Sequence, residues 1–195
     1  MRRFLTKKKI MNKLQIILLS AICSLTWAAT AQDTNILKTE IGVFENRTGV
    51  VIVKGFGQIG SVVAEAAEIS VRCKETADIS IGQKAYGLAI QITGNGFQAE
   101  RIYVDDDEID ALLSGINYLI KITYDVTALP GFEASYTSKG GLQVSANSIR
   151  KEGGVRFSLQ GNYGPQIPLS SVQMTQLYNL ITQARKNLDA VKAGK

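Results

Sequence analysis

Residues 102–119 read IYVDDDEIDALLSGINYL, and 65 positions later residues 167–184 read IPLSSVQMTQLYNLITQA. Each stretch begins with a strand-like triplet, continues through polar residues and ends in apolar residues at helical spacing. The apolar positions coincide under this shift: 109 with 174, 112 with 177, 113 with 178 and 116 with 181. The pattern predicts two amphipathic helices, each closing a set of strands, in a chain built from two related halves.

Polar residues predict where each helix begins. Asp105 is followed by Glu108, and Ser170 is followed by Gln173 at the same spacing. This spacing is typical of a capping box, in which the two residues satisfy each other's backbone N–H groups. We therefore expect the first helix to begin at Asp105 and the second to begin at Ser170.

The acidic run Asp105–Asp110 also resembles the start of a calcium-binding loop. An EF-hand loop counted from Asp105 needs glycine at its sixth position and glutamate at its twelfth, where this chain has Asp110 and Ile116. Acidic side chains at a helix N-terminus compensate the positive end of the helix dipole. We assign the run to that role and expect no metal site.

The shift of 65 extends upstream without a gap and places Ile90 and Ile92 on Val155 and Phe157. Apolar and polar residues alternate in both regions, as in half-buried strands. Turn signals separate strands at Asn95–Gly96 and Gly140–Gly141, and Pro130–Gly131 marks the joint between the two halves. The same shift makes further upstream matches: 77 with 142, 79 with 144, 81 with 146, and the identical Glu68, Ser70 and Lys74 with Glu133, Ser135 and Lys139.

These patterns predict an α+β fold. We expect an antiparallel β-sheet formed by two tandem strand-then-helix halves, at about 48–125 and about 131–195, each crossed by one amphipathic helix. Each helix is expected to lay its apolar stripe on the strands of its own half. Residues 32–47 carry few periodic signals, so they are either an ordered lead-in or a loose tail of this single domain.

Residues 1–31 have the three parts of a secretory signal peptide: a basic start, an apolar stretch and the small residues Ala29-Thr30-Ala31. The apolar run of about 12 residues is too short to cross a ~30 Å hydrocarbon core, which argues against the alternative of an uncleaved anchor. We expect translation to start at Met1 or Met11 and cleavage to occur before Gln32. The exported chain would be periplasmic or secreted, with no permanent membrane span.

Charge and composition exclude several function classes. Six of the 22 basic residues and none of the 17 acidic residues lie in residues 1–31, so the remainder has a net charge of −1. The chain has no histidine, which excludes a serine triad of the usual kind, a Cys–His dyad and a histidine-ligated metal. The basic residues on strands are expected on solvated sheet faces rather than on a nucleic-acid platform: Arg72, Lys74, Arg101, Arg150, Lys151 and Arg156.

Cys73 is the one cysteine that would remain after cleavage, so no internal disulfide is expected. The alternation around it places Cys73 on the same face as Ile69 and Val71, whereas Ser70 and Arg72 point the other way. This phase predicts a buried structural thiol rather than a reactive or intermolecular one.

Residues 55–60 read GFGQIG and match the dinucleotide-binding fingerprint, with Glu75 a further 20 positions after Gly55. The segment that follows could form only a short crossover helix at about 61–68, and the next segments alternate like antiparallel strands. We therefore predict that residues 55–60 form a strand-to-strand turn, with Val62 and Val63 entering the next strand, and that they bind no dinucleotide.

The segments Ile102–Leu119 and Phe132–Gly140 resemble a family of exported bacterial proteins that has no assigned activity. The resemblance covers most of the chain after residue 31 and implies export, but it implies no site residues. The order of two strand-then-helix halves is also similar to that of the Whirly-type single-stranded DNA-binding proteins. Their lysine-rich binding motif has no counterpart in this chain, and fold analogy alone does not carry function.

No catalytic, cofactor-binding or metal-ligating residue is assigned from the sequence, and no cofactor is expected. The favoured function is a non-enzymatic binding or structural protein of the cell envelope. Its candidate partners are another envelope protein or a small ligand, and nucleic acid is not expected. The alternative is a single-stranded nucleic-acid-binding protein with a Whirly-like architecture, and an enzyme is the third choice.

Overall fold

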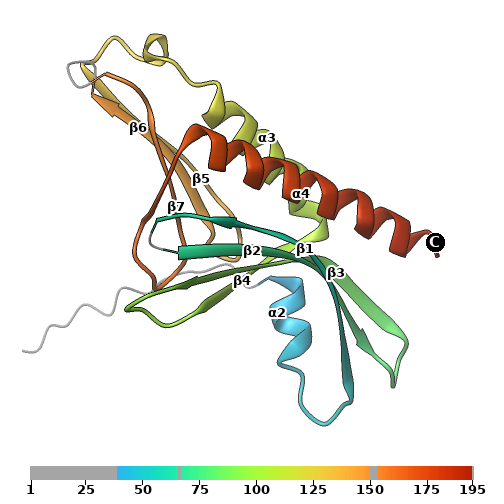
Figure 1. The fold of residues 1–195 in the computed structure, drawn as a ribbon. Helices are drawn as coiled ribbons and strands as arrows, with labels where there is room; N and C mark the ends of the chain where they lie inside the picture. The colour runs from blue at the N-terminus through green and yellow to red at the C-terminus, as the bar shows by residue number, and fades with distance from the viewer. Residues whose placement is uncertain (1–38, 66, 150–152, 195) are drawn as a thin grey trace, which may run out of the picture. The chain divides into compact units, whose positions relative to one another are not determined.

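The computed structural model describes residues 39–65, 67–149 and 153–194 (Figure 1). The expected signal peptide and the expected cleavage site before Gln32 lie outside these residues. The described part is an α+β fold with two antiparallel sheets of four strands each, in the orders β1-β2-β3-β4 and β5-β6-β7-β8. Within each sheet, every strand pairs with its neighbour in chain order.

The elements have the following bounds. The first half contains α2 (Glu40–Glu45), β1 (Ile52–Val63), β2 (Ala67–Asp78), β3 (Gln83–Gly94), β4 (Glu100–Asp105), the 3-10 turn η1 (Asp106–Glu108) and α3 (Ile109–Ile120). The second half contains the 3-10 turn η2 (Tyr124–Val126), β5 (Gly131–Thr137), β6 (Gln143–Ile149), β7 (Arg156–Gln160), β8 (Ile167–Leu169) and α4 (Ser171–Lys192). The predicted turns at Asn95–Gly96 and Gly140–Gly141 are confirmed, with φ values of 87° at Gly96 and 86° at Gly141.

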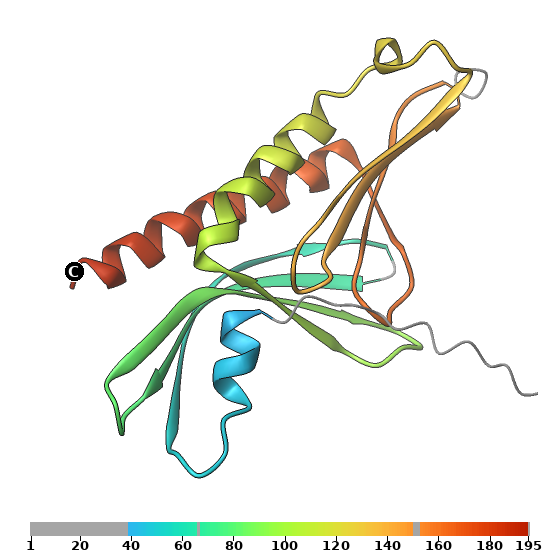
Figure 2. The same ribbon diagram turned by 180° about the vertical axis from the view of Figure 1, so that it is seen from behind.

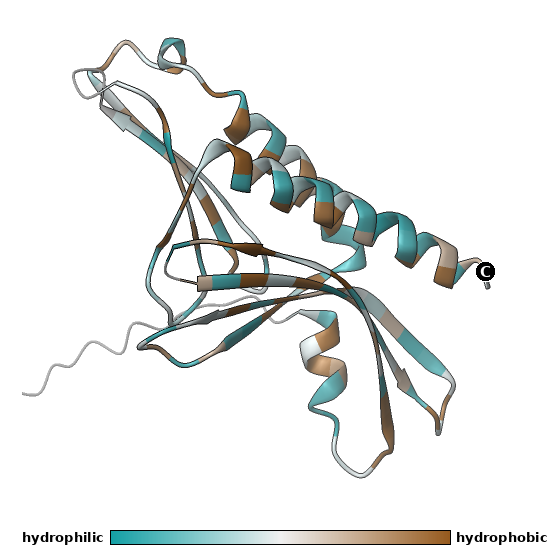
Figure 3. Ribbon diagram, viewed as in Figure 1, coloured by the Kyte–Doolittle hydropathy of each residue, from teal (hydrophilic) through white to brown (hydrophobic). Residues whose placement is uncertain are grey.

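The apolar stripes of the two long helices are confirmed. Ile109, Leu112, Ile116 and Leu119 are buried on α3, and their counterparts 65 positions later are buried on α4: Met174, Leu177, Ile181 and Ala184. Apolar and polar residues alternate around α4 and along β2 in Figure 3. These side chains belong to one hydrophobic cluster that includes residues of both sheets.

The helices are exchanged between the halves, which contradicts the expectation that each packs on its own strands. Helix α3 packs on β5 and β6, whereas α4 packs mainly on β1 and β2. Two contacts illustrate the exchange: the Cys73 thiol of β2 donates to the Ala184 carbonyl of α4 at 3.3 Å, and Gly115 of α3 lies against the Tyr136 ring of β5. The helices lie side by side and run in opposite directions (Figures 1 and 2). An apolar stripe determines that a helix is buried, but either sheet can bury it.

The gapless repeat is wrong upstream of β4 and β8. Val104 lies opposite Leu88 in the first sheet, and the equivalent Leu169 lies opposite Phe157 in the second, so the offset has grown from 65 to 69. In the next strand of each sheet, Cys73 of β2 lies opposite Leu88 and Ala146 of β6 lies opposite Phe157, so the offset there is 73. The hairpins of the first half are therefore longer by four residues each. An insertion of an even number of residues leaves each side chain on the same face of its strand. The apolar–polar alternation of the two halves therefore still coincides under the shift of 65.

The glycine-rich segment 55–60 lies inside β1, so the predicted turn is wrong. The turn to β2 follows Val63, and β1 pairs antiparallel with β2 along its whole length, with a bulge between Gln58 and Gly60. Gly60 leaves room for the Leu180 side chain of α4, which would lie 2.8 Å from an added Cβ. In the described residues no crossover helix follows this segment, so the βαβ geometry of a dinucleotide fold is absent there.

One of the two predicted capping boxes forms. Ser170 and Gln173 hydrogen-bond each other's backbone N–H groups at 3.2 and 2.7 Å. The box at Asp105 is wrong, because the Asp105 carboxylate accepts hydrogen bonds from the N–H groups of Glu40 and Ile41 at 2.8 and 3.2 Å. Asp105 thus caps α2, a helix that the sequence pattern did not predict. Part of the lead-in is consequently an ordered helix held against the first sheet.

Candidate functional site

The second sheet exposes a row of polar side chains from three adjacent strands. Glu133 of β5 lies opposite Asn147 of β6, which lies opposite Arg156 of β7. Side chains alternate between the faces of a strand, so this row lies on the face opposite to the buried Ala146 and Phe157. Glu133 and Arg156 are exposed and Asn147 is half-buried. A carboxylate, an amide and a guanidinium therefore stand side by side on one surface.

A second polar row adjoins the first. The hydroxyls of Ser145 and Ser158 are 2.7 Å apart, and the Gln166 amide donates to Ser158 at 2.7 Å. Both serines are buried, at 4% and 5% relative exposure, although they lie on the polar face. Gln166 is exposed and ties the segment before β8 to this row. These hydrogen bonds hold the side chains of Ser145, Ser158 and Gln166 in place beside the first row.

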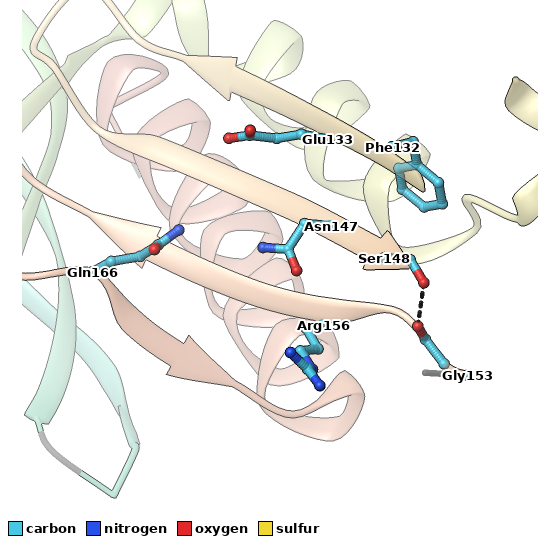
Figure 4. Close-up of a pocket in the computed structure, with 8 residues that line it drawn as sticks. Phe132, Glu133, Asn147, Ser148, Gly153, Arg156 and Gln166 are labelled. Carbon is cyan, nitrogen blue, oxygen red and sulfur yellow. Dashed lines mark hydrogen bonds between the residues drawn. The ribbon is translucent and has the colours of Figure 1, made fainter. Parts of the chain in front are cut away.

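A pocket of about 320 Å³ opens above the first row (Figure 4). Its lining consists of Phe132, Glu133, Asn147, Ser148, Gly153, Gly154, Arg156 and Gln166. The hydroxyl of Ser148 donates to the carbonyl of Gly154, which holds the rim of the pocket at the end of β6. The pocket offers acceptors from Glu133, donors from Arg156 and both from the two amides. This arrangement can orient a small polar molecule by hydrogen bonds.

The sequence did not single out this pocket. Arg156 was expected on a solvated strand face, and it is exposed there, but the row becomes visible only when the strand register is known. Arg72 and Arg101 also lie on strands, the first half-buried with its Nε donating to Gln58 at 2.8 Å and the second exposed. Arg150 and Lys151 lie outside the described residues.

Lys74 contradicts the expectation of a solvated face. Its side chain is fully buried beneath α2 on the outer face of the first sheet, where its Nζ forms an ion pair with Glu45. The same Nζ lies 4.2 Å from the ring centroid of Phe56 and 5.1 Å from that of Tyr103. We call Glu45, Lys54, Phe56, Lys74 and Tyr103 the Lys74 cluster. Because α2 covers this strand face, Lys74 is buried with Glu45 instead of being exposed to solvent.

Hydrogen bonds complete the Lys74 cluster. The Tyr103 hydroxyl donates to Glu45 Oε2 at 2.9 Å, and Lys54 Nζ lies 3.3 Å from the same oxygen. Burial alone would raise the pKa of Glu45, but the hydrogen bonds from Lys74, Tyr103 and Lys54 outweigh it and hold the pKa below its usual value. Burial, and secondarily Glu45, raises the pKa of Tyr103. The cluster fastens α2 to the first sheet.

The acidic run forms ion pairs rather than a helix cap. Asp106 pairs with Arg185 and Lys192 of α4 at 2.8 and 2.5 Å, and Asp107 pairs with Lys139 at 2.8 Å. Glu108 accepts from the backbone N–H of Lys139 at 2.8 Å. The acids therefore connect η1 to α4 and to the β5–β6 turn. Within the described ranges, no group of three or more acidic or cysteine side chains is placed to hold a metal ion.

The expectation that Cys73 is a buried free thiol is confirmed. Its burial raises the pKa of the thiol to about 11, so the nucleophilic thiolate is scarce at neutral pH. We expect the folded protein to react with a thiol-specific disulfide reagent far more slowly than the urea-unfolded protein. Full labelling of the native chain at the unfolded rate would contradict the buried assignment.

No helix among the described residues is long and apolar enough to cross a membrane. No family model, no curated protein and no solved structure matches this chain. The candidate site therefore depends on its own geometry.

Proposed function

We propose that this chain is an exported, non-enzymatic binding protein of the cell envelope, and that the pocket on the second sheet holds a small polar ligand. The observation that carries the proposal is the row Glu133–Asn147–Arg156 beside Gln166, in which four polar side chains of different character converge on one cavity. Converging polar groups in a concave site are the usual mark of a ligand site.

The chemistry of the lining narrows the ligand class. Glu133 accepts hydrogen bonds, Arg156 donates them, and the amides of Asn147 and Gln166 do both. Such a set suits a ligand with several hydroxyl or amide groups, such as a small sugar or glycan fragment. The volume of about 320 Å³ lies at the lower end of ligand pockets, which favours a compact molecule.

A titration tests the pocket. Amide NMR spectra would be recorded while neutral sugars, amino sugars, amino acids and short oligonucleotides are added in turn. We expect a sugar to shift the signals of β5–β7, and Asn147→Ala to weaken that binding by about tenfold, the effect of one lost hydrogen bond to a ligand. Asn179→Ala, an exposed substitution on α4, is the matched control. Shifts confined to the first sheet, or equal affinity in both variants, would contradict the pocket.

Export is a separate part of the proposal, supported by the order of basic, apolar and small residues in 1–31. We expect cells to release a chain that begins near Gln32, and N-terminal sequencing with intact mass measurement checks this. A released protein that retains residues 14–25 would contradict it.

Single-stranded nucleic-acid binding is the second candidate, because the chain has two four-stranded antiparallel sheets, each followed by a helix. Nucleic-acid binding of this kind weakens steeply with salt, since bound counterions are released. We would measure oligonucleotide affinity at low and high salt. A tight, strongly salt-dependent affinity would favour this candidate over the pocket ligand.

A further inference from the structure

Strand β1 forms a long free edge of the first sheet. It has 12 residues and pairs only with β2 in the sheet order. Every residue from Val53 to Gln58 is exposed. An edge strand of this kind presents backbone N–H and C=O groups that can pair with another strand.

The register identifies the groups that face outward. The Ile79 N–H donates to the Val51 carbonyl at 3.4 Å, so Val51 belongs to the set that bonds to β2. In an antiparallel ladder this role alternates, so Val53, Gly55 and Gly57 also bond to β2. The residues between them direct their N–H and C=O groups to the free edge: Ile52, Lys54, Phe56 and Gln58. No hydrogen bond made by the described residues reaches these groups.

The other edge strands are shorter than β1, and the far end of β1 is occupied. The outward carbonyl of Val63, at the far end of β1, accepts from the Gln173 side chain at 2.8 Å. At the opposite edge, β4 has only six residues, and the side-chain carboxylate of its first residue, Glu100, accepts from the backbone N–H of Asn162 at 2.6 Å. Strand β8 has only three residues. The fourth edge strand, β5, has seven residues and packs against α3. At 12 residues β1 is therefore the longest edge strand among the described strands, and its stretch 52–58 is open.

The stretch 52–58 carries only one of the features that normally prevent pairing, the charged Lys54, and the bulge of β1 lies beyond it. Residues 50–60 contain no proline and one charged residue, Lys54. Three apolar side chains on or beside the edge are exposed: Val51 at 61%, Val53 at 50% and Phe56 at 53%. The start of β1 appears as a brown, hydrophobic stretch in Figure 3. A pairing partner would cover this surface.

We propose that β1 pairs antiparallel with β1 of a second copy of this chain, about a twofold axis that passes between the two Gly55 residues. The first sheets of the two copies, with four strands each, would then form one continuous sheet of eight strands. Ile52 would lie opposite Gln58 of the second copy, and Lys54 opposite Phe56. The twofold axis repeats each of these two pairs, so four pairs form with two backbone hydrogen bonds each, about eight in total.

The sequence of the edge favours this register and a second copy as the occupant. If the twofold axis moved one residue toward the start of β1, Lys54 would lie opposite Lys54 of the second copy. Such a like-charge pair destabilises a sheet. If the axis moved one residue toward the end of β1, Ile52 would lie opposite Gly60 of the second copy, which is beyond the bulge. In the proposed register Lys54 instead faces an aromatic ring, and Val53 faces the side-chain-free Gly57. The segment is thus complementary to itself.

Cysteine cross-linking tests the axis. The two Gly55 residues would form a non-hydrogen-bonded pair, with Cα atoms about 4.5 Å apart, within the range of a disulfide. A Cβ at Gly55 is accommodated, since its nearest neighbour is the Glu75 Cβ at 3.6 Å. We expect Gly55→Cys to form a covalent dimer under mild oxidation. Val53→Cys, which is also exposed but lies off the axis, should not form this dimer. It should instead cross-link when mixed with Gly57→Cys in a Cys73→Ser background, which is needed because the Cys73 Cβ lies 3.6 Å from a Cβ at Gly57.

The mass in solution tests the pairing without a disulfide. We expect light scattering of the purified protein to show a concentration-dependent dimer. Lys54→Pro removes one outward N–H, a substitution that an edge strand tolerates, and should shift the protein to monomer. Lys54→Ala, the matched control, removes the same side chain but keeps the N–H and should remain dimeric.

Three results would overturn the proposal. The first is a wild-type monomer at every concentration, together with no Gly55→Cys dimer. The second is cross-linking of Val53→Cys as efficient as that of Gly55→Cys, which would exclude the proposed axis. The third is a monomer that gains protection along β1 only when an extended peptide is added, since the edge would then serve a foreign strand.

Discussion

Replacing Glu45 with alanine is expected to lower the free energy of unfolding by about 3 kcal/mol, because it leaves the Lys74 ammonium buried without its counter-charge. The Lys74 side chain is fully buried, and only the Phe56 and Tyr103 rings would remain beside its Nζ. Denaturant unfolding measures the loss, and hydrogen exchange of residues 40–45 reports whether α2 detaches so that Lys74 can reach water.

Lys54→Ala is the matched control for Glu45→Ala. Lys54 pairs with the same carboxylate, but its side chain is 42% exposed, so its removal should cost less than about 1 kcal/mol. Lys74→Met should also cost less than Glu45→Ala, since Glu45 would keep Lys54 and no buried charge would be left alone. Equal losses for Glu45→Ala and Lys54→Ala would show that the buried pair does not hold α2.

The same pair predicts a pH dependence. The folded protein holds the pKa of Glu45 below its ordinary value of 4.5, so the stabilisation is fully present above that value. It is lost as the pH falls through the lower, folded-state pKa and Glu45 becomes protonated. We expect exchange of α2 to rise in this acidic window in the wild type. Glu45→Gln should lack this acid-dependent step, because its side chain does not titrate.

Alternation and helical spacing predicted which side chains are buried, but not which elements meet. Ile69, Val71 and Cys73 lie inward as the pattern required. The offset between the halves was misjudged because an insertion of four residues per hairpin preserves the phase of a two-residue period. The exchange of α3 and α4 between the sheets had no sequence signal, since each apolar stripe fits either sheet.

Helix α2 and the candidate site were missed for a related reason. A six-residue helix is too short to show a helical period, and the Asp105 carboxylate that binds its first N–H groups, in addition to its N-cap Thr39, lies more than 60 positions away in the chain. Lys74 reads as a solvated strand residue until α2 is placed above it. The row Glu133–Asn147–Arg156 likewise requires the register of three strands. Local patterns carry no information on such long-range partners.

Leu112→Ala and Leu177→Ala are expected to cost similar amounts, about 2–5 kcal/mol each, the usual range for a buried leucine. Both side chains are fully buried, on α3 and α4 respectively, and both belong to the cluster that joins the two sheets. Substitution of the exposed Ser114 or Asn179 on the same helices should change stability by no more than about 0.5 kcal/mol. Urea unfolding of the four variants measures these differences.

The exchanged packing adds a local signature to this pair of variants. Because α3 packs on β5 and β6, Leu112→Ala should increase amide exchange mainly in the second sheet, although Leu112 belongs to the first half of the chain. Leu177→Ala should do the reverse and loosen β1 and β2. Each helix loosening the strands of its own half would contradict the exchange. Leu112→Ala as stable as the wild type, with Leu177→Ala unfolded, would show that the two helices are not equivalent in the core.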